Sequence, residues 1–368
     1  MKFKILHVVG NMNSGGTETM LLNLYRKIDR EKVQFDFLCL EGKKSYYQEQ
    51  IESLGGRIIC IQNLKSIKEI SDVIKKYGPY KVVHAHTLFN SGIAMYAANK
   101  NNVEIRIAHA HTTADNEEGV IRRTYIKIMR RLIINNSTNL LACSNMAGKY
   151  LFGEQLIKTD KYTLLPNLVN YEPIINIDIS KVDRLKKEYD LENADIVIGH
   201  IGTFKKAKNQ KFILNIVAKL KDMNKKVKLL LVGSGSMENE LKEITKMLNI
   251  EKEVIFTGIR DDIDTILNST DVFVFPSTFE GLGLVLLEAQ AAGLPCIVSE
   301  AIQPEADLQL GLFSKLNLYD GAESWVNKII EVYGKKETDK QKILDAFDKQ
   351  GYSTEKCISK LLSIYNID

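Results

Sequence analysis

The sequence lacks any hydrophobic run of the roughly 18 residues that a transmembrane helix requires. Its N-terminal segment, MKFKILHVVG, is typical of a β-strand and not of a signal peptide. The sequence also lacks a CxxC motif. Its five cysteines are odd in number and widely spaced. Neither a disulfide framework nor a structural zinc knot is supported. We therefore expect a cytoplasmic protein.

The net charge is small, at +4, and we expect no nucleic-acid partner. The charge is nevertheless unevenly divided. Residues 1–170 carry 24 Lys and Arg against 15 Asp and Glu, whereas the remainder carries 26 against 31. This asymmetry favours an N-terminal half that meets an anionic surface.

The 368 residues, of which 45% are hydrophobic and 26% charged, indicate a globular protein of about two domains. Short apolar runs alternate with amphipathic segments, and the pattern restarts after LLPNLVN. Such alternation predicts parallel sheets covered by helices. We expect an α/β protein with two doubly wound Rossmann-like domains facing an interdomain cleft. The predicted parts are residues 1–170, residues 171–345, and a C-terminal helix in 346–368 that can return to the N-terminal domain.

Three glycine-bearing turns follow predicted strands: GNMNSGGTE (10–18), GTFKKAKN (202–209) and GSGSMENE (233–240). Glycine after a strand lets backbone N–H groups approach a phosphate, and the next helix adds its positive end. None of the three is a Walker loop or a full GxGxxG motif. A plain strand-to-helix turn remains the alternative at each.

All six histidines lie in or just beyond predicted strands, and the spacing HAH occurs twice, at 84–86 and 109–111. Because alternate residues of a strand share a face, each pair can point both imidazoles into the cleft or bind a metal. Hydrogen bonding to backbone is the alternative, which we favour for His7 and His84. Zinc is disfavoured, since no HxxE, cysteine or third carboxylate accompanies the pairs.

The segment TFEGLGLVLLEAQAAGLPCIVSE (278–300) places one carboxylate, Glu280, beside two glycines and a second, Glu288, inside an otherwise apolar run. The glycines predict a helix from about Leu284 to Ala292, with Glu280 before it and Glu288 one turn inside. The free N–H groups of residues 281–284 and the two carboxylates can bind a ligand rich in hydroxyls, such as a sugar. A capped core helix with one solvated glutamate is the alternative.

These segments together resemble a known family. E280-G-L-G-L-V-L-L-E288 looks like the E-x7-E signature of the retaining GT-B glycosyltransferases, specifically glycosyltransferase family 4 of the capsular and exopolysaccharide type. The NSGGTE loop, the HxH strand ends, PNLVN, IGTFKKAKN, LLLVGSGSMENEL and VIFTGIRDDI follow the family's order and spacing. The resemblance covers nearly the whole chain.

The resemblance implies a hexosyltransferase that moves a sugar from a UDP-sugar to a polysaccharide or lipid-linked glycan. His111 or His109 would bond the sugar near its reacting carbon, Lys208 would neutralise the leaving diphosphate, and Glu288 would bond the ribose. The remaining donor-binding positions by resemblance are Gly16, Thr203, Gly258, Ile259, Arg260, Glu280, Gly281, Leu282, Gly283 and Leu284. Glu280 is counted with the catalytic residues as well, and transfer would retain the anomeric configuration.

One departure from the family concerns position 203. The family commonly has Arg there, and Thr203 cannot supply the bidentate contact that Arg gives to a diphosphate. This departure motivates a second hypothesis, a non-catalytic nucleotide-sugar-binding partner subunit. A third is a metal-dependent hydrolase that uses the HxH pairs.

We expect the transferase to need no metal and no further cofactor, because Lys208, loop amides and helix ends can neutralise the diphosphate. D262-I-D264 has DxD form, but its place at a helix start favours a capping role. Residues 119–137, GVIRRTYIKIMRRLIINNS, hold five basic residues and no acidic one. This helix can bind peripherally to an anionic inner membrane face, or simply cover the sheet with a solvated basic side.

Overall fold

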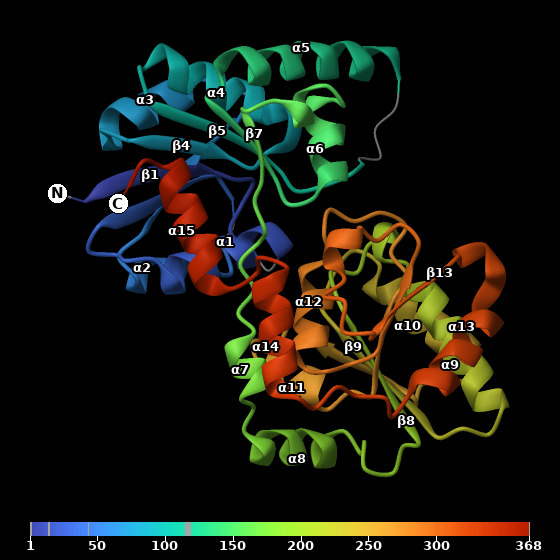
Figure 1. The fold of residues 1–368 in the computed structure, drawn as a ribbon. Helices are drawn as coiled ribbons and strands as arrows, with labels where there is room; N and C mark the ends of the chain where they lie inside the picture. The colour runs from blue at the N-terminus through green and yellow to red at the C-terminus, as the bar shows by residue number, and fades with distance from the viewer. Residues whose placement is uncertain (1, 14, 43, 115–118, 368) are drawn as a thin grey trace. The chain divides into compact units, whose positions relative to one another are not determined.

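The computed structural model describes residues 2–13, 15–42, 44–114 and 119–367. The chain divides into two compact units, Met1–Leu168 with Gly351–Asp368, and Val169–Gln350. Each unit is an α/β domain with its own sheet (Figure 1).

The described residues of the first unit form a seven-stranded parallel sheet in the order β3-β2-β1-β4-β5-β6-β7. Its central strands are mostly apolar and largely buried, as expected for strands covered on both faces. The strands are β1 (Phe3–Val8), β2 (Val33–Leu40), β3 (Arg57–Ile61), β4 (Val82–Ala85), β5 (Ile105–Ala110), β6 (Asn139–Ala142) and β7 (Tyr162–Leu164).

Helices connect these strands, and the last helix of the chain returns to pack against the first. Its Lys360 donates a hydrogen bond to the Leu164 carbonyl over 2.8 Å. The helices are α1 (Gly16–Lys27), α2 (Gln48–Ser53), α3 (Ile67–Tyr77), η1 (Leu88–Asn90), α4 (Ser91–Lys100), α5 (Val120–Asn136), α6 (Asn145–Phe152), η2 (Leu156–Lys158) and α15 (Thr354–Ile364).

The second unit has a six-stranded parallel sheet in the order β10-β9-β8-β11-β12-β13. The strands are β8 (Ile196–Ile201), β9 (Val227–Val232), β10 (Val254–Gly258), β11 (Val272–Phe275), β12 (Cys296–Ser299) and β13 (Phe313–Leu316). The helices are α7 (Glu172–Ile175), α8 (Ile179–Glu188), η3 (Lys206–Lys208), α9 (Gln210–Asp222), α10 (Glu238–Met247), α11 (Ile263–Asn268), α12 (Leu284–Ala291), η4 (Pro304–Ala306), η5 (Leu318–Asp320), α13 (Gly321–Val332) and α14 (Lys340–Lys349).

Both faces of the second sheet are covered. Ile196 and Ile198 of β8 join one hydrophobic cluster with Trp325 of α13, whereas Val197 between them joins another with Ile266 of α11. Successive strand residues point to opposite faces, so each face has its own helical layer. The predicted α/β class with two doubly wound domains is confirmed.

The strand orders decide where ligands can bind. All strands are parallel, but the order in which the chain adds strands to the sheet reverses between β1 and β4 in the first sheet and between β8 and β11 in the second. The loops that leave neighbouring strands at such a point run to opposite sides and open a crevice at the carboxyl ends of the strands. The candidate residues should therefore lie after β1, β4, β8 and β11.

Candidate active site

The loops after β8 and β11 lie together in the second unit. The N–H of Thr278 donates to the carbonyl of Ala207 over 2.8 Å and joins the two loops. One loop carries Lys208, the last residue of η3, and the other carries Glu280. These two residues, which the sequence could assign only separate roles, form a salt bridge.

The pair is shielded from water, since the Lys208 and Glu280 side chains are only 14% and 20% exposed. The Lys208 ammonium also lies 4.6 Å from the centre of the Phe275 ring at the end of β11. A cation over an aromatic face is held by the ring quadrupole. This arrangement presents one positive charge and one carboxylate at the point where the strand order reverses.

The start of α12 supplies a second set of polar groups. Gly283 adopts a left-handed φ of 82°, and a Cβ there would come within 3.1 Å of Leu286. No side chain caps the helix at this N-cap position, so the first backbone N–H groups of α12 receive no acceptor from a capping side chain. Gly281 and Leu282 before it are buried, and Leu284, the first helical residue, is partly buried.

Glu288 lies one turn into α12 and keeps part of its surface exposed. Within the described ranges no side chain forms a hydrogen bond or salt bridge with its carboxylate. Burial among apolar neighbours raises the pKa of Glu288 from 4.5 to about 7. The carboxylate in the apolar run therefore has no partner within its own unit.

The turn after β10 holds three predicted donor-binding residues. Gly258 has a left-handed φ of 71° and accepts a hydrogen bond from the Gly233 N–H, while Ile259 is exposed. The Arg260 guanidinium forms two bonds with the Asp262 carboxylate, with Nε–Oδ1 and Nη2–Oδ2 distances of 2.8 and 2.6 Å. The expected capping role for Asp262 is wrong. Its side chain occupies the N-cap position but binds Arg260 and caps no helix N–H group.

Packing explains the glycines of the loop after β9. A Cβ at Gly233 would lie 2.3 Å from the Gly202 carbonyl oxygen, and one at Gly235 would lie 2.4 Å from that of Phe204. The loops after β8 and β9 approach too closely for side chains at these positions. Close packing of the two loops therefore explains both glycines of the GSG sequence without a bound phosphate.

Thr203, by contrast, is exposed on the loop after β8. Its carbonyl accepts a hydrogen bond from Gln210, whose amide nitrogen also lies 3.4 Å from Nε2 of the buried His200. His200 in turn donates from Nδ1 to the Val274 carbonyl over 2.9 Å. This buried chain fixes the backbone around Thr203 and leaves its side chain in solvent.

In the first unit, Gly16 begins α1 after β1. A Cβ at Gly16 would meet no atom within 4 Å, so packing among the described residues does not require glycine there. That observation is compatible with a ligand that approaches this helix start. Residue 14 of the same loop lies outside the described residues.

The two histidines considered for catalysis have different surroundings. His109 ends β5 with a 1% exposed side chain, and its Nδ1 lies 3.2 Å from Nε2 of His84. His111, just beyond the strand, is partly exposed and bonds through Nε2 to Nδ1 of His86 over 2.8 Å. Of the pair, His111 is therefore the residue that keeps some exposed surface. Burial lowers the pKa of both histidines, that of His111 to about 3, so both imidazoles are neutral at pH 7.

Other contacts escaped the sequence analysis. Phe275 beneath Lys208 looked like an ordinary strand residue, and no pattern indicated that Tyr365, which follows α15, bonds His84 over 2.8 Å. His7 and His84, which we expected to bond backbone, bond other side chains instead. The positions of these histidines in their strands bring them together only because β1, β4 and β5 are neighbours in the sheet, and the sequence does not give that strand order.

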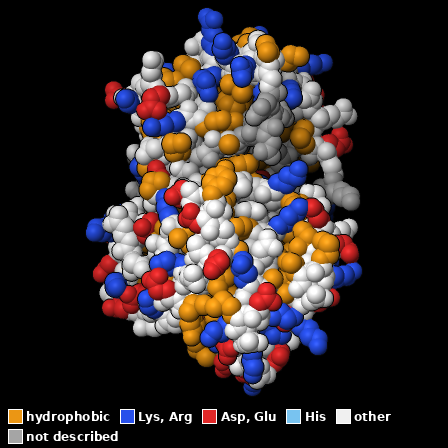
Figure 2. Space-filling model, turned by 90° about the vertical axis from the view of Figure 1, so that its right-hand side faces the viewer, with side chains coloured by type: hydrophobic (Ala, Val, Ile, Leu, Met, Phe, Trp, Pro, Cys, Tyr) orange, Lys and Arg blue, Asp and Glu red, His pale blue; other side chains and the backbone are white. Residues whose placement is uncertain are grey.

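Helix α5 carries the basic segment of the first unit. Arg130 donates to the carbonyls of Leu151 and Tyr150 and is thereby part of the fold. Arg123, Lys127 and Arg131 are exposed and follow one another at four-residue spacing on one side of the helix. The exposed hydrophobic residues beside them are Val120, Ile121 and Ile128. Blue and orange side chains are interspersed at the top of Figure 2, the end of the molecule where α5 lies in Figure 1.

Doubly wound units of these strand orders, with glycine turns and helix starts after the strands, define the class of Rossmann-like α/β proteins. Comparison with known proteins gives the family. Residues 14–173 match the family described as "Glycosyltransferase Family 4", and residues 181–347 match "Glycosyl transferases group 1". The chain belongs to the glycosyltransferases of the family 4 type and is a transferase enzyme. This result favours the transferase hypothesis over the binding subunit and the hydrolase.

Two curated relatives cover nearly the whole chain. A putative glycosyltransferase of Bacillus subtilis, EpsF, is 36% identical over 99% of this chain and 96% of its own length. An Escherichia coli enzyme, UDP-Gal:alpha-D-GlcNAc-diphosphoundecaprenol alpha-1,3-galactosyltransferase, is 26% identical over 100% of this chain and 94% of its own.

A solved structure supports the fold. Anabaena HepE in complex with UDP-glucose superposes with a TM-score of 0.78 at 18% identity, covering 98% of this chain and 99% of that one. The predicted GT-B fold class is confirmed. Among the described residues, no helix has the length and apolar character needed to cross a membrane.

Proposed function

We propose that this enzyme moves a sugar, with retention, from a UDP-sugar to a polysaccharide or lipid-linked glycan acceptor in the cytoplasm. The observation that carries the proposal is Glu288, a carboxylate in an apolar helix without a partner in its unit. Two ribose hydroxyls would supply the missing hydrogen-bond donors. The choice of UDP is supported by the UDP-sugar named for the E. coli relative and by UDP-glucose in HepE.

Lys208 and Glu280 would change partners when the donor arrives. The Lys208 ammonium, now paired with Glu280, would turn its charge toward the diphosphate, and the N–H groups at the start of α12 would add to it. The released Glu280 carboxylate would then accept hydrogen bonds from the sugar hydroxyls. The same ion pair thus holds both groups in place before binding.

Bond breaking requires stabilisation of two opposite charges. The sugar becomes oxocarbenium-like as the bond to phosphate stretches, and the diphosphate gains negative charge. Lys208 would neutralise the leaving group without a metal ion, and the neutral His111 would hydrogen-bond the sugar near the reacting carbon. The acceptor hydroxyl would attack from the same face and pass its proton to the leaving phosphate oxygen, which retains the configuration.

The exposed side of α5 would place the first unit on an anionic membrane. Arg123, Lys127 and Arg131 would meet lipid head groups, while Ile121 and Ile128 would enter the interface. A lipid-linked acceptor is supported by the diphosphoundecaprenol substrate named for the E. coli relative. Docking of this kind would bring the enzyme to an acceptor that cannot leave the bilayer.

The test is transfer of radiolabelled sugar from a panel of UDP-sugars to lipid-linked and polysaccharide acceptors, with a chelator present. Lys208→Ala should abolish transfer, because no arginine at position 203 shares the diphosphate charge. Lys211→Ala is the matched control, since Lys211 forms an exposed salt bridge with Glu240 in the same unit. Transfer by Lys208→Ala at the rate of the control would contradict the proposed role, and no transfer by wild type to any acceptor would overturn the proposal itself.

A further inference from the structure

Five histidines of the first unit gather on one face of the sheet, at the point where the strand order reverses. His7 of β1 is the direct register partner of His84 of β4, and both belong to the row of side chains that points to the same face. His86 follows two residues after His84 and continues that row, and His109 and His111 form the equivalent pair at the end of β5.

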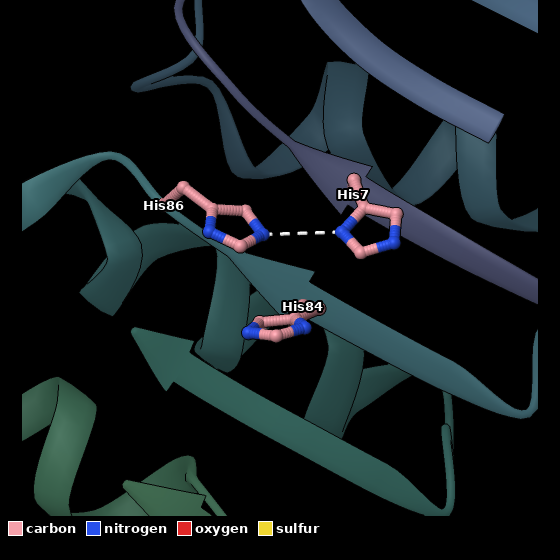
Figure 3. A group of neighbouring side chains, drawn as sticks. All are labelled: His7, His84 and His86. Atoms are coloured by element: carbon pink, nitrogen blue, oxygen red, sulfur yellow. Dashed lines mark hydrogen bonds between the residues drawn. The ribbon is translucent and has the colours of Figure 1, made fainter. Parts of the chain in front are cut away.

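The rings of this histidine cluster contact one another directly. Nδ1 of His7 lies 3.1 Å from Nε2 of His86, and the ring centres of His84 and His86 are 4.3 Å apart. Figure 3 shows the facing nitrogens of His7 and His86, with the His84 ring beside them. Each of the three offers a nitrogen, and these three atoms all lie within 4.8 Å of one another.

The cluster is neutral and incompletely hydrogen-bonded. Burial lowers the pKa of His7 to about 3 and holds the pKa values of His84 and His86 well below the ordinary range. Neutral imidazole is the form that binds a metal. Among the described residues, the buried Nε2 atoms of His7 and His109 have no hydrogen-bond partner.

We propose that His7, His84 and His86 bind one Zn²⁺ ion, with water as the fourth ligand. Two nitrogens at 2.0–2.1 Å from a tetrahedral zinc lie about 3.3 Å apart, close to the 3.1 Å between His7 Nδ1 and His86 Nε2. The third ligand is Nε2 of His84, which would exchange its bond to His109 for the metal. Three neutral imidazoles suit zinc and not magnesium or calcium, which prefer oxygen ligands.

Two of the three remaining ring nitrogens have the outer partners that zinc ligands usually show, whereas the buried Nε2 of His7 has none among the described residues. Nδ1 of His84 lies 2.8 Å from the Tyr365 hydroxyl, and Nδ1 of His86 lies 2.8 Å from Nε2 of His111. With zinc on both Nε2 atoms, each Nδ1 carries the proton and donates it outward. His111 then accepts at Nε2 and keeps its own proton on Nδ1. Given the proposed function, zinc would fix which His111 nitrogen can donate to the sugar, without taking part in the transfer.

Zinc binding is tested on untagged, metal-stripped protein by equilibrium dialysis with Zn²⁺ followed by elemental analysis. The expected result is one equivalent of zinc per chain for wild type and for His200→Asn, which removes a buried histidine of the other unit. His86→Asn should lose the zinc. His7→Phe should lose it as well, and a phenyl ring suits a site whose neighbours include Phe35 and Phe37. Circular dichroism and thermal unfolding show whether each variant folds.

Cobalt gives a second readout, because Co²⁺ in a four-coordinate site has strong visible absorption bands. These bands should appear in wild type and vanish in His86→Asn, whose residue is partly exposed and tolerates replacement best. Wild type without a full equivalent of zinc, or zinc retained by both cluster variants, would overturn the proposal. His109→Asn should keep the metal, so its loss there would move the site to His86, His109 and His111 and refute the assignment made here. None of these outcomes depends on transferase activity.

Discussion

Replacing Glu288 with glutamine should make the free enzyme more stable at neutral and alkaline pH. In the unfolded chain this carboxyl ionises near 4.5, whereas in the folded protein burial raises its pKa to about 7. Because the folded state holds the proton more tightly, the stabilisation is complete below pH 4.5 and is lost as the pH rises through 7. At 1.36 kcal/mol per pH unit, the ionised carboxylate costs up to about 3 kcal/mol at pH 8.

Glutamine has the same shape and no charge at any pH. Glu288→Gln should therefore exceed wild type in free energy of unfolding by up to about 3 kcal/mol at pH 8, and by only about 1 kcal/mol at pH 5.5. Urea unfolding followed by circular dichroism at the two pH values measures the difference. Glu300→Gln, which neutralises an exposed carboxyl of the same unit, should show no such trend.

Donor binding should change in the opposite direction. A carboxylate that accepts two ribose hydroxyls is worth roughly 1.5 to 3 kcal/mol, so Glu288→Gln should weaken UDP-sugar binding about 10- to 100-fold at pH 8. In wild type the affinity should fall about tenfold from pH 8 to pH 6, because the carboxylate must ionise before it binds. The variant should lack this pH dependence in titration calorimetry. A variant that is both less stable and unchanged in affinity would refute the reasoning about Glu288.

Two further predictions concern the first unit. His111→Ala should lower kcat about tenfold with little change in donor affinity, since one neutral hydrogen bond is worth roughly 1 kcal/mol. His109→Ala should instead lower the thermal unfolding midpoint, because its ring is buried against His84, and equal kinetic losses in both variants would contradict this division. Replacing Arg123, Lys127 and Arg131 together by Gln should weaken co-sedimentation with anionic liposomes by up to about 3 kcal/mol, or roughly 100-fold. Equal pelleting of wild type with neutral liposomes would exclude the electrostatic docking.

Much of the fold could be predicted because its strands are buried on both faces. Runs such as those of β1 and β9 are mostly apolar, with Lys4 and His7 in β1 and Lys228 in β9 as the exceptions, and they stand out between amphipathic helices. The strands β7 and β13 could not be predicted in the same way, because they are three- and four-residue strands at the sheet edges with no fully buried residue. An edge strand that is partly solvated has no continuous apolar run to reveal it.

The candidate site was predictable residue by residue but not contact by contact. Glu280 and Lys208 were each recognised from a motif, yet their salt bridge joins positions 72 residues apart and depends on how two loops meet. The same limit explains why the sequence indicated a helix-capping role for Asp262, which lies at the start of a helix. Arg260, two residues earlier, offers its carboxylate two charge-assisted bonds, and these outweigh one bond to a helix N–H.

Glu280 and Glu288 of the segment 278–300 illustrate how one short stretch can provide two different carboxylates. Glu280 forms a salt bridge with Lys208, so its carboxylate can leave that lysine only when another anion replaces it. Glu288, eight residues on, has no cation and holds its proton until about pH 7. Under the proposed function, a ligand with both a diphosphate and vicinal hydroxyls would satisfy the two together, because the diphosphate would displace Glu280 from Lys208 while the hydroxyls would stabilise the ionised Glu288. A simple sugar lacks the diphosphate and inorganic diphosphate lacks the hydroxyls. The segment therefore favours a nucleotide sugar over either fragment alone.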